Sequence, residues 1–220
     1  MFKRTLPEGF VVLSRAVPSL VIDLKYTGSD NFVGRPIAGY AEDGDAIVTQ
    51  ECAQALAKIQ ETLQDPHFKA AFKVKEPKLV ILEAFRPLMA GDDFWAWGQS
   101  DCQKTKQAYY PRIAKQDFFA LGYLARRSSH SRGSTVDVTI IDTANNQTVD
   151  FGTPFDFMDE LSHPDNQAVS KTAYENRQHL KNLMAEFGFE GIPQEWWHFT
   201  LKNEPFPDTY FNFEVAKYES

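Results

Sequence analysis

One candidate strand places a carboxylate between core residues, and this constrains the fold more than any other feature of the sequence. Residues 135–141 alternate, so that Val136, Val138 and Ile140 are expected to face one side of a sheet while Asp137 faces the other. An ionised aspartate in such a strand is unfavourable unless it is solvated, paired or bound to a cation. Any fold of this chain must therefore give Asp137 one of these environments.

The other apolar patterns predict helices and strands that do not alternate regularly. Helices are expected over 49–65 and 171–187 and over part of 88–109, and further strands over 78–85 and 195–201. Thr49 stands where an N-cap residue belongs, and Gly188 stands where a glycine ends a helix. No repeat or low-complexity linker divides the 220 residues. We therefore expect an α+β fold with a largely antiparallel sheet, in a single compact domain over residues 1–220.

Charge and composition exclude several classes of partner. The chain has 23 Lys and Arg against 30 Asp and Glu, a net charge of −7, which argues against binding to a nucleic acid backbone. No run of ~18 apolar residues predicts a membrane span, and no signal peptide is recognisable. We expect a cytoplasmic protein, or a periplasmic one if a leader has been removed, with no obligatory protein partner. The two cysteines cannot form a cysteine-rich zinc module, so histidines and carboxylates would have to hold any metal.

Two histidines lie near other residues that could complete a metal site. His130 lies in a Ser-Arg-Gly turn just before Asp137, and His198 lies in an aromatic strand three residues after Glu195. Two imidazoles and a carboxylate are three ligands of tetrahedral zinc, with the fourth position left for water, and Glu195 could accept that water's proton. Singly, each histidine is more simply a hydrogen-bonded core residue, and Asp137 a surface charge. The occurrence of all these features together favours the metal site.

The sequence also resembles a known family. Ser128-x-His130-x-x-Gly133-x-x-x-Asp137 followed by Glu195-x-x-His198 is similar to the signature of the zinc D-alanyl-D-alanine dipeptidases of the VanX type. Further similar stretches, in the same order, are Asp23-Leu-Lys-Tyr26, Asp30-Asn-Phe32, Phe85-Arg-Pro87, Tyr109-Tyr-Pro111, Phe155-Asp-Phe-Met-Asp159 and Glu204-Pro-Phe-Pro207. The resemblance implies a central antiparallel sheet flanked by helices, and one Zn²⁺ per chain bound by His130, Asp137 and His198.

The resemblance also assigns roles around the metal. It implies that Glu195 is the general base and acid and that Arg86 lies near the scissile carbonyl. The residues that it places at the substrate pocket are Tyr26, Ser128, Asp156 and Glu83. From the sequence alone, Arg86 could equally form a surface salt bridge, and Asp156 and Ser128 could simply form turns. Thr135 departs from the family motif, which usually has alanine there, and its hydroxyl could bond to Asp137 on the same strand face.

The activity that follows from the resemblance is hydrolysis of D-Ala-D-Ala by zinc-bound water, with a small dipeptide as the partner. Asp156 could pair with the free ammonium group of the substrate and restrict the enzyme to short peptides. A D,D-carboxypeptidase or endopeptidase that trims longer peptidoglycan stems is the alternative enzyme. An inactive zinc-bearing binding domain, as in Hedgehog-like proteins, is the alternative outside enzymes, but such a domain needs neither Glu195 nor Arg86.

Overall fold

The main sheet is built around three long antiparallel neighbours. The computed structural model describes residues 5–218. The strand order is β2 (Val21–Ile22), β4 (Pro77–Glu83), β5 (Thr135–Asp142), β8 (Glu195–Leu201) and β7 (Phe189–Ile192), and β6 (Gln147–Thr148) pairs with β5. Every pair is antiparallel except β2 with β4, which is parallel. The expected α+β fold with a largely antiparallel sheet is confirmed, and the parallel edge pair is an addition to it.

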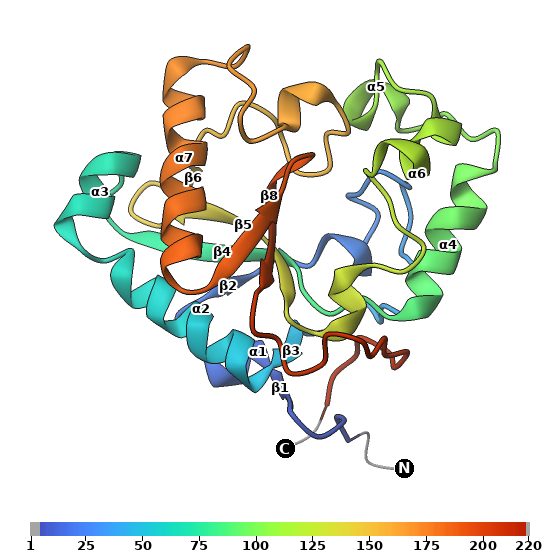
Figure 1. Ribbon diagram of the computed structural model, residues 1–220, viewed down its shortest axis with the longest axis horizontal. Coiled ribbons are helices and arrows are strands. Elements are labelled where there is room, and N and C mark those ends of the chain that lie inside the picture. Colours follow the sequence, from blue (N-terminus) through green and yellow to red (C-terminus); the bar gives the residue numbers. More distant parts are fainter. Residues whose placement is uncertain (1–4, 219–220) are drawn as a thin grey trace.

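One face of this sheet packs against helices. These are α2 (Gln50–Thr62), α3 (Pro66–Phe72) and α7 (Lys171–Glu186), on the left of Figure 1. Val136, Val138 and Ile140 join apolar residues of α2 and α7 in a continuous core, as the alternation in the sequence predicts. The predicted caps are also present: the Thr49 side chain accepts the N–H of Cys52, and Gly188 follows α7 with φ +87°.

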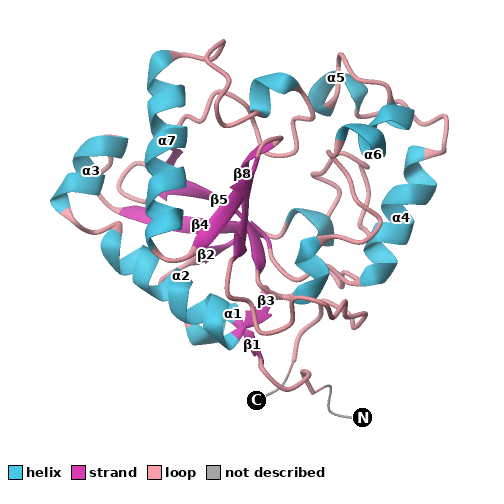
Figure 2. Ribbon diagram, viewed as in Figure 1, coloured by secondary structure: helices cyan, strands magenta, loops and turns pink. Residues whose placement is uncertain are grey.

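A second, more aromatic core lies among the remaining elements, which Figure 2 shows as helices and two short strands joined by long loops. Its helices and strands are β1 (Phe10–Val12), β3 (Ile47–Thr49), α4 (Leu88–Gly98), α5 (Lys106–Tyr109) and α6 (Phe118–Leu121), whereas α1 (Leu13–Ala16) contributes Leu13 to the first core. Single 3₁₀ turns are η1 (Lys25–Thr27), η2 (Lys115–Asp117), η3 (Ser129–Arg132) and η4 (Glu160–Ser162). The partly helical segment expected over 88–109 is therefore α4 and α5.

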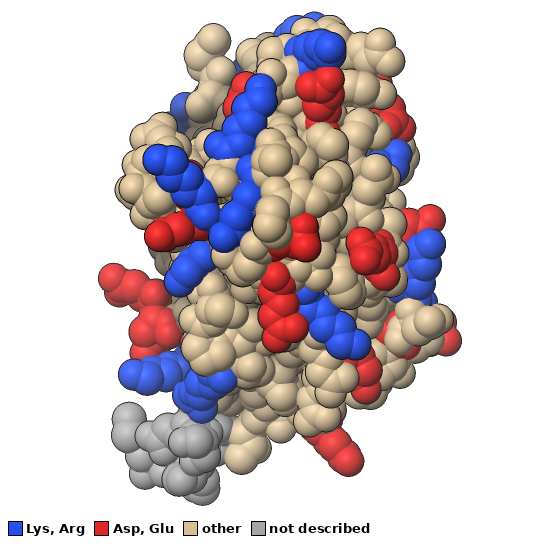
Figure 3. Space-filling view, turned by 90° about the vertical axis from the view of Figure 1, so that its left-hand side faces the viewer, with Lys and Arg blue, Asp and Glu red and all other residues tan. Residues whose placement is uncertain are grey.

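The surface charges are consistent with the argument that the chain does not bind a nucleic acid backbone. On the face that Figure 3 presents, basic and acidic side chains are interspersed. Among the residues that the structure describes, no helix is long and apolar enough to cross a membrane.

Candidate active site

Strand register brings three of the expected site residues into one row across the sheet. In the β4–β5 ladder Glu83 lies opposite Asp137, and in the β5–β8 ladder Asp137 lies opposite His198. Directly opposite residues of antiparallel strands point to the same face. The row therefore lies on the face turned away from α2 and α7, between the sheet and the aromatic core. Asp137 has the environment that its sequence position requires, a buried polar site.

His130 reaches the same point from the turn that precedes β5. It lies in η3, where the Ser128 hydroxyl accepts the His130 backbone N–H at 3.3 Å. Gly133 ends this turn with φ +87°, a conformation that favours glycine, and a Cβ there would lie 2.2 Å from Phe10. The Ser-Arg-Gly sequence thus folds the chain back so that the His130 ring lies over the start of the strand.

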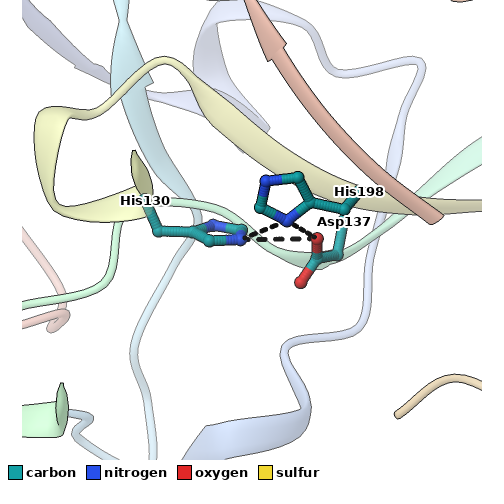
Figure 4. A group of neighbouring side chains, drawn as sticks. All are labelled: His130, Asp137 and His198. Atoms are coloured by element: carbon teal, nitrogen blue, oxygen red, sulfur yellow. Dashed lines mark hydrogen bonds and ion pairs between the residues drawn. The ribbon is translucent and has the colours of Figure 1, made fainter. Parts of the chain in front are cut away.

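The three candidate ligand atoms form a nearly equilateral triangle. His130 Nε2 lies 3.4 Å from Asp137 Oδ1 and 3.2 Å from His198 Nδ1, and His198 Nδ1 lies 3.1 Å from Asp137 Oδ1. Figure 4 shows the three side chains pointing at one another. All three residues are buried, and they are the one group of potential metal ligands found in the described part of the chain.

This triangle fits a tetrahedral zinc site. Tetrahedral bonds of about 2.0–2.1 Å hold ligand atoms about 3.3–3.4 Å apart, close to the separations observed. Asp137 Oδ1 is fully buried and has no hydrogen-bond partner among the described residues. A buried carboxylate oxygen without a partner is unfavourable, and a bound cation would remove that penalty. The donor set and its spacing therefore suit a metal ion.

Neighbouring groups orient both imidazoles for this task. His130 Nδ1 lies 2.8 Å from the Ala84 carbonyl oxygen, so it carries the proton and leaves the Nε2 lone pair free. On the outer side of His198, Nε2 lies 3.3 Å from Ser129 Oγ, which leaves Nδ1 toward the triangle. Sequence reasoning missed Ser129 and the Ala84 carbonyl; the adjacent serines of the motif were the available signal for Ser129.

Burial and neighbouring groups favour the metal-binding protonation states of Asp137 and His198. Burial lowers the pKa of His198, although Asp137 opposes this, so the neutral imidazole is favoured. Burial opposes ionisation of Asp137, but His130 and His198 outweigh it and hold the pKa of Asp137 below its usual range. An ionised carboxylate and a neutral imidazole are forms that coordinate a metal, so both shifts favour coordination by Asp137 and His198.

Glu195 lies beside the triangle, at the first residue of β8. Its Oε2 is 3.6 Å from His198 Nδ1, and its side chain is 12% exposed. Burial raises the pKa of Glu195 well above its ordinary value, and the charges of Asp137 and Asp156 add to this. The adjacent Trp196 and Trp197 are buried in the sheet–helix core and anchor this strand.

Arg86 is buried and paired, so it forms no surface salt bridge. Its Nε lies 2.7 Å from Glu83 Oε1 and its Nη2 lies 2.5 Å from Glu83 Oε2. Tyr40, which the sequence did not single out, donates its hydroxyl to the same Oε1 at 2.6 Å. Burial opposes the charge of Arg86, but Glu83 outweighs it and raises the Arg86 pKa well above its ordinary value. The guanidinium is permanently cationic beside the candidate metal ligands.

Tyr26 and Asp156 meet on another wall of the site. The Tyr26 hydroxyl donates to Asp156 Oδ2 at 2.9 Å, and both residues are buried. Burial raises the pKa of Asp156 well above its ordinary value, and the charge of Asp137 adds to this. Asp156 has φ +59°, an uncommon conformation for a residue other than glycine that tends to occur at functional positions. Without a positive charge beside it, this buried carboxyl group favours its protonated form.

One expectation from the sequence is wrong. The Thr135 hydroxyl does not bond to Asp137; it lies 2.9 Å from the hydroxyl of Thr200. Residues two apart on a strand are farther from each other than residues directly opposite on neighbouring strands, and Thr135 lies opposite Thr200. The threonine therefore joins β5 to β8 next to the site and does not orient the carboxylate.

Comparison with known proteins gives consistent matches over nearly the whole chain. A model of peptidase family M15, described as D-ala-D-ala dipeptidase, matches residues 7–216. A D-alanyl-D-alanine dipeptidase of Streptomyces coelicolor is 38% identical over 94% of this chain and 98% of its own length. Enzymes of the same name from Enterococcus faecalis (38%, 96% of this chain and 100% of theirs) and Escherichia coli (31%, 87% and 83%) are also similar.

Proposed function

The chain belongs to peptidase family M15, the D-Ala-D-Ala dipeptidases, and on that premise we propose that it is a zinc-dependent dipeptidase that hydrolyses D-alanyl-D-alanine to D-alanine. The observation that carries the proposal is the triangle of His130, Asp137 and His198 with separations of 3.1–3.4 Å, together with a carboxylate 3.6 Å away. A purely structural site has no use for that extra carboxylate.

In this proposal His130, Asp137 and His198 hold the ion. Zinc would supply a Lewis acid that polarises the scissile carbonyl and makes water more acidic. Glu195 accepts a proton from the attacking water and then donates it to the nitrogen of the leaving amine, so that the C–N bond breaks and a neutral amine departs. Arg86 stabilises the negative charge that develops on the carbonyl oxygen.

The remaining polar groups of the site are proposed to bind the substrate. Asp156, with the Tyr26 hydroxyl fixed against it, pairs with the free ammonium group of the dipeptide, whose positive charge favours the ionised carboxylate. Ser128 lies at the turn beside His130, where it can contact the substrate. The buried site favours a small substrate, because a long donor peptide would have to displace these side chains. All of these groups come from one chain, which we expect to act as a single domain over residues 1–220 without a protein partner.

The proposal is tested with Glu195→Gln, which keeps the shape of the side chain and removes the base. We expect zinc content to stay at one ion per chain while kcat for D-Ala-D-Ala falls by about 10²–10⁴-fold. Glu190→Gln is the matched control, because Glu190 is an exposed residue of β7, and it should keep wild-type kcat. Unchanged turnover in Glu195→Gln would remove the assignment of the base.

Substrate class is tested with D-Ala-D-Ala, L-Ala-L-Ala and an N-acylated peptide ending in D-Ala-D-Ala. The proposal expects turnover of D-Ala-D-Ala and little turnover of the N-acylated peptide, which has no ammonium group for Asp156. Preference for the N-acylated peptide would instead identify a carboxypeptidase. No turnover of any of them by the zinc-loaded protein would indicate a binding domain.

A further inference from the structure

We propose that Tyr40 is a positioning residue for catalysis, which acts through Glu83 to hold the guanidinium of Arg86 against the reacting carbonyl. The inference rests on the proposed function, because it needs Arg86 to act on the substrate. It also gives Glu83 a different task from substrate contact. Neither the family motif nor the spacing of the site residues points to Tyr40.

The hydrogen bonds leave Arg86 with one free edge. Glu83 takes the Nε hydrogen and one Nη2 hydrogen of the guanidinium, in a bidentate contact that fixes the plane of the group. Among the described residues, no group accepts the hydrogens of Nη1. The edge formed by Nη1 and Nη2 is therefore available to an oxyanion, and its direction depends on where Glu83 holds the other edge.

Glu83 is placed to aim that edge at the metal ligands. The same Oε2 that accepts from Arg86 lies 3.8 Å from His130 Nε2, and the Glu83 backbone is paired with Asp137 at a register shift in β4. The Glu83 side chain is 0% exposed. A fully buried ion pair contributes little net stability, since desolvation offsets the attraction. Its presence here is better explained by the geometry that it imposes on Arg86.

Tyr40 completes the support of Glu83 from a separate segment. Its hydroxyl donates to Oε1, the oxygen that also accepts the Nε hydrogen of Arg86. The Tyr40 ring packs edge-on against Tyr26 at 5.7 Å, and its neighbour Gly39 has no room for a Cβ, which would lie 2.6 Å from Pro87. The Tyr26 ring therefore packs against the phenol, the backbone beside it lies close to Pro87, and the Tyr40 hydroxyl restrains rotation of the Glu83 carboxylate.

The test is Tyr40→Phe, which deletes only the hydroxyl. We expect kcat for D-Ala-D-Ala to fall about 10–150-fold, the effect of losing one hydrogen bond to a charged group, while KM and zinc content stay within about twofold of wild type. In an Arg86→Ala background the same substitution should change kcat less than twofold, because it acts through Arg86. Tyr110→Phe is the control, since Tyr110 is buried against Trp97 and Phe118, and should leave kcat unchanged.

A second measurement separates this inference from the proposed function. The ¹⁵Nε–H signal of Arg86, identified by its absence in Arg86→Ala, should exchange with solvent at least about fivefold faster in Tyr40→Phe than in wild type or Tyr110→Phe. Unchanged exchange, or an equal kcat loss with and without Arg86, overturns the positioning role. Wild-type turnover in Arg86→Ala would instead overturn the catalytic role of Arg86 in the proposed function, whatever the exchange rate.

Discussion

Replacing Gly133 with alanine should test how tightly the turn that carries His130 is built. Gly133 has φ +87°, and a Cβ on it would lie 2.2 Å from Cε1 and 2.7 Å from Cζ of Phe10. The Phe10 ring has little freedom to move away, because aromatic rings surround it with centroids 4.9–5.9 Å distant, namely Phe85, Phe206, Phe211 and Phe213. Two penalties are therefore expected together.

The magnitudes follow from those two penalties. The left-handed conformation costs a residue with a Cβ roughly 1–2 kcal/mol, and overpacking a rigid core costs about 1–3 kcal/mol. Gly133→Ala should thus lower the free energy of unfolding by about 2–5 kcal/mol. Because the turn also carries His130, we expect zinc affinity to fall by at least about tenfold.

Two other glycines serve as matched controls. Gly188 has the same φ of +87°, but its Cβ would come no closer than 3.6 Å to Leu201, so Gly188→Ala should show only the conformational cost of roughly 1–2 kcal/mol. Gly28 has an ordinary φ and open space around it, and Gly28→Ala should stay within about 1 kcal/mol of wild type. Equilibrium unfolding in urea, with zinc titration of each variant, measures both effects. Equal losses in Gly133→Ala and Gly188→Ala would refute the steric argument.

Three further variants address the ligands and the pocket walls. Asp137→Ala should lose zinc by metal analysis while Asp142→Ala, which alters the far end of β5, should retain it; full occupancy in the first would contradict the ligand set. In metal-free protein, folded Asp156 keeps its proton at pH values where the unfolded chain has lost it, so the free energy of unfolding falls as pH rises above about 4. Urea unfolding should therefore show the stability of Asp156→Asn increasing relative to wild type from pH 5 to pH 8. A stability difference that stays constant with pH would argue against this. Arg177 donates to the backbone carbonyls of Phe151 and His163, on either side of the loop that carries Asp156. Arg177→Met should therefore lower the free energy of unfolding in urea by about 2–4 kcal/mol and raise KM. An unchanged KM would show that Arg177 stabilises the fold without affecting substrate binding.

Local patterns were sufficient to predict the elements that present the site. The helices with their caps at Thr49 and Gly188, and the strand that turns Asp137 away from Val136 and Val138, depend on interactions between near neighbours in the chain. Periodicity and capping report such interactions directly. The parallel pairing of β2 with β4 could not be predicted in this way, since two residues are too few for a recognisable strand pattern.

Side-chain partners that depend on strand register or loop placement could not be predicted from the sequence. The bond from Thr135 to Thr200 joins residues 65 apart, and the bond from Tyr40 to Glu83 joins residues 43 apart. Neither pair has a spacing that a sequence pattern marks. Each becomes visible once the strands or loops that carry it are placed beside each other.

The candidate metal ligands differ from those pairs because coordination itself restricts the fold. If Asp137 and His198 bind one ion, and both lie in strands, their strands must be neighbours with the two residues nearly opposite each other. The observed pairing of Asp137 with His198 meets that condition. A shift of one residue would turn His198 to the core face and separate the ligands. A motif of metal ligands therefore predicts a strand register, whereas the Tyr40–Glu83 hydrogen bond, which could be replaced by many other partners, predicts none.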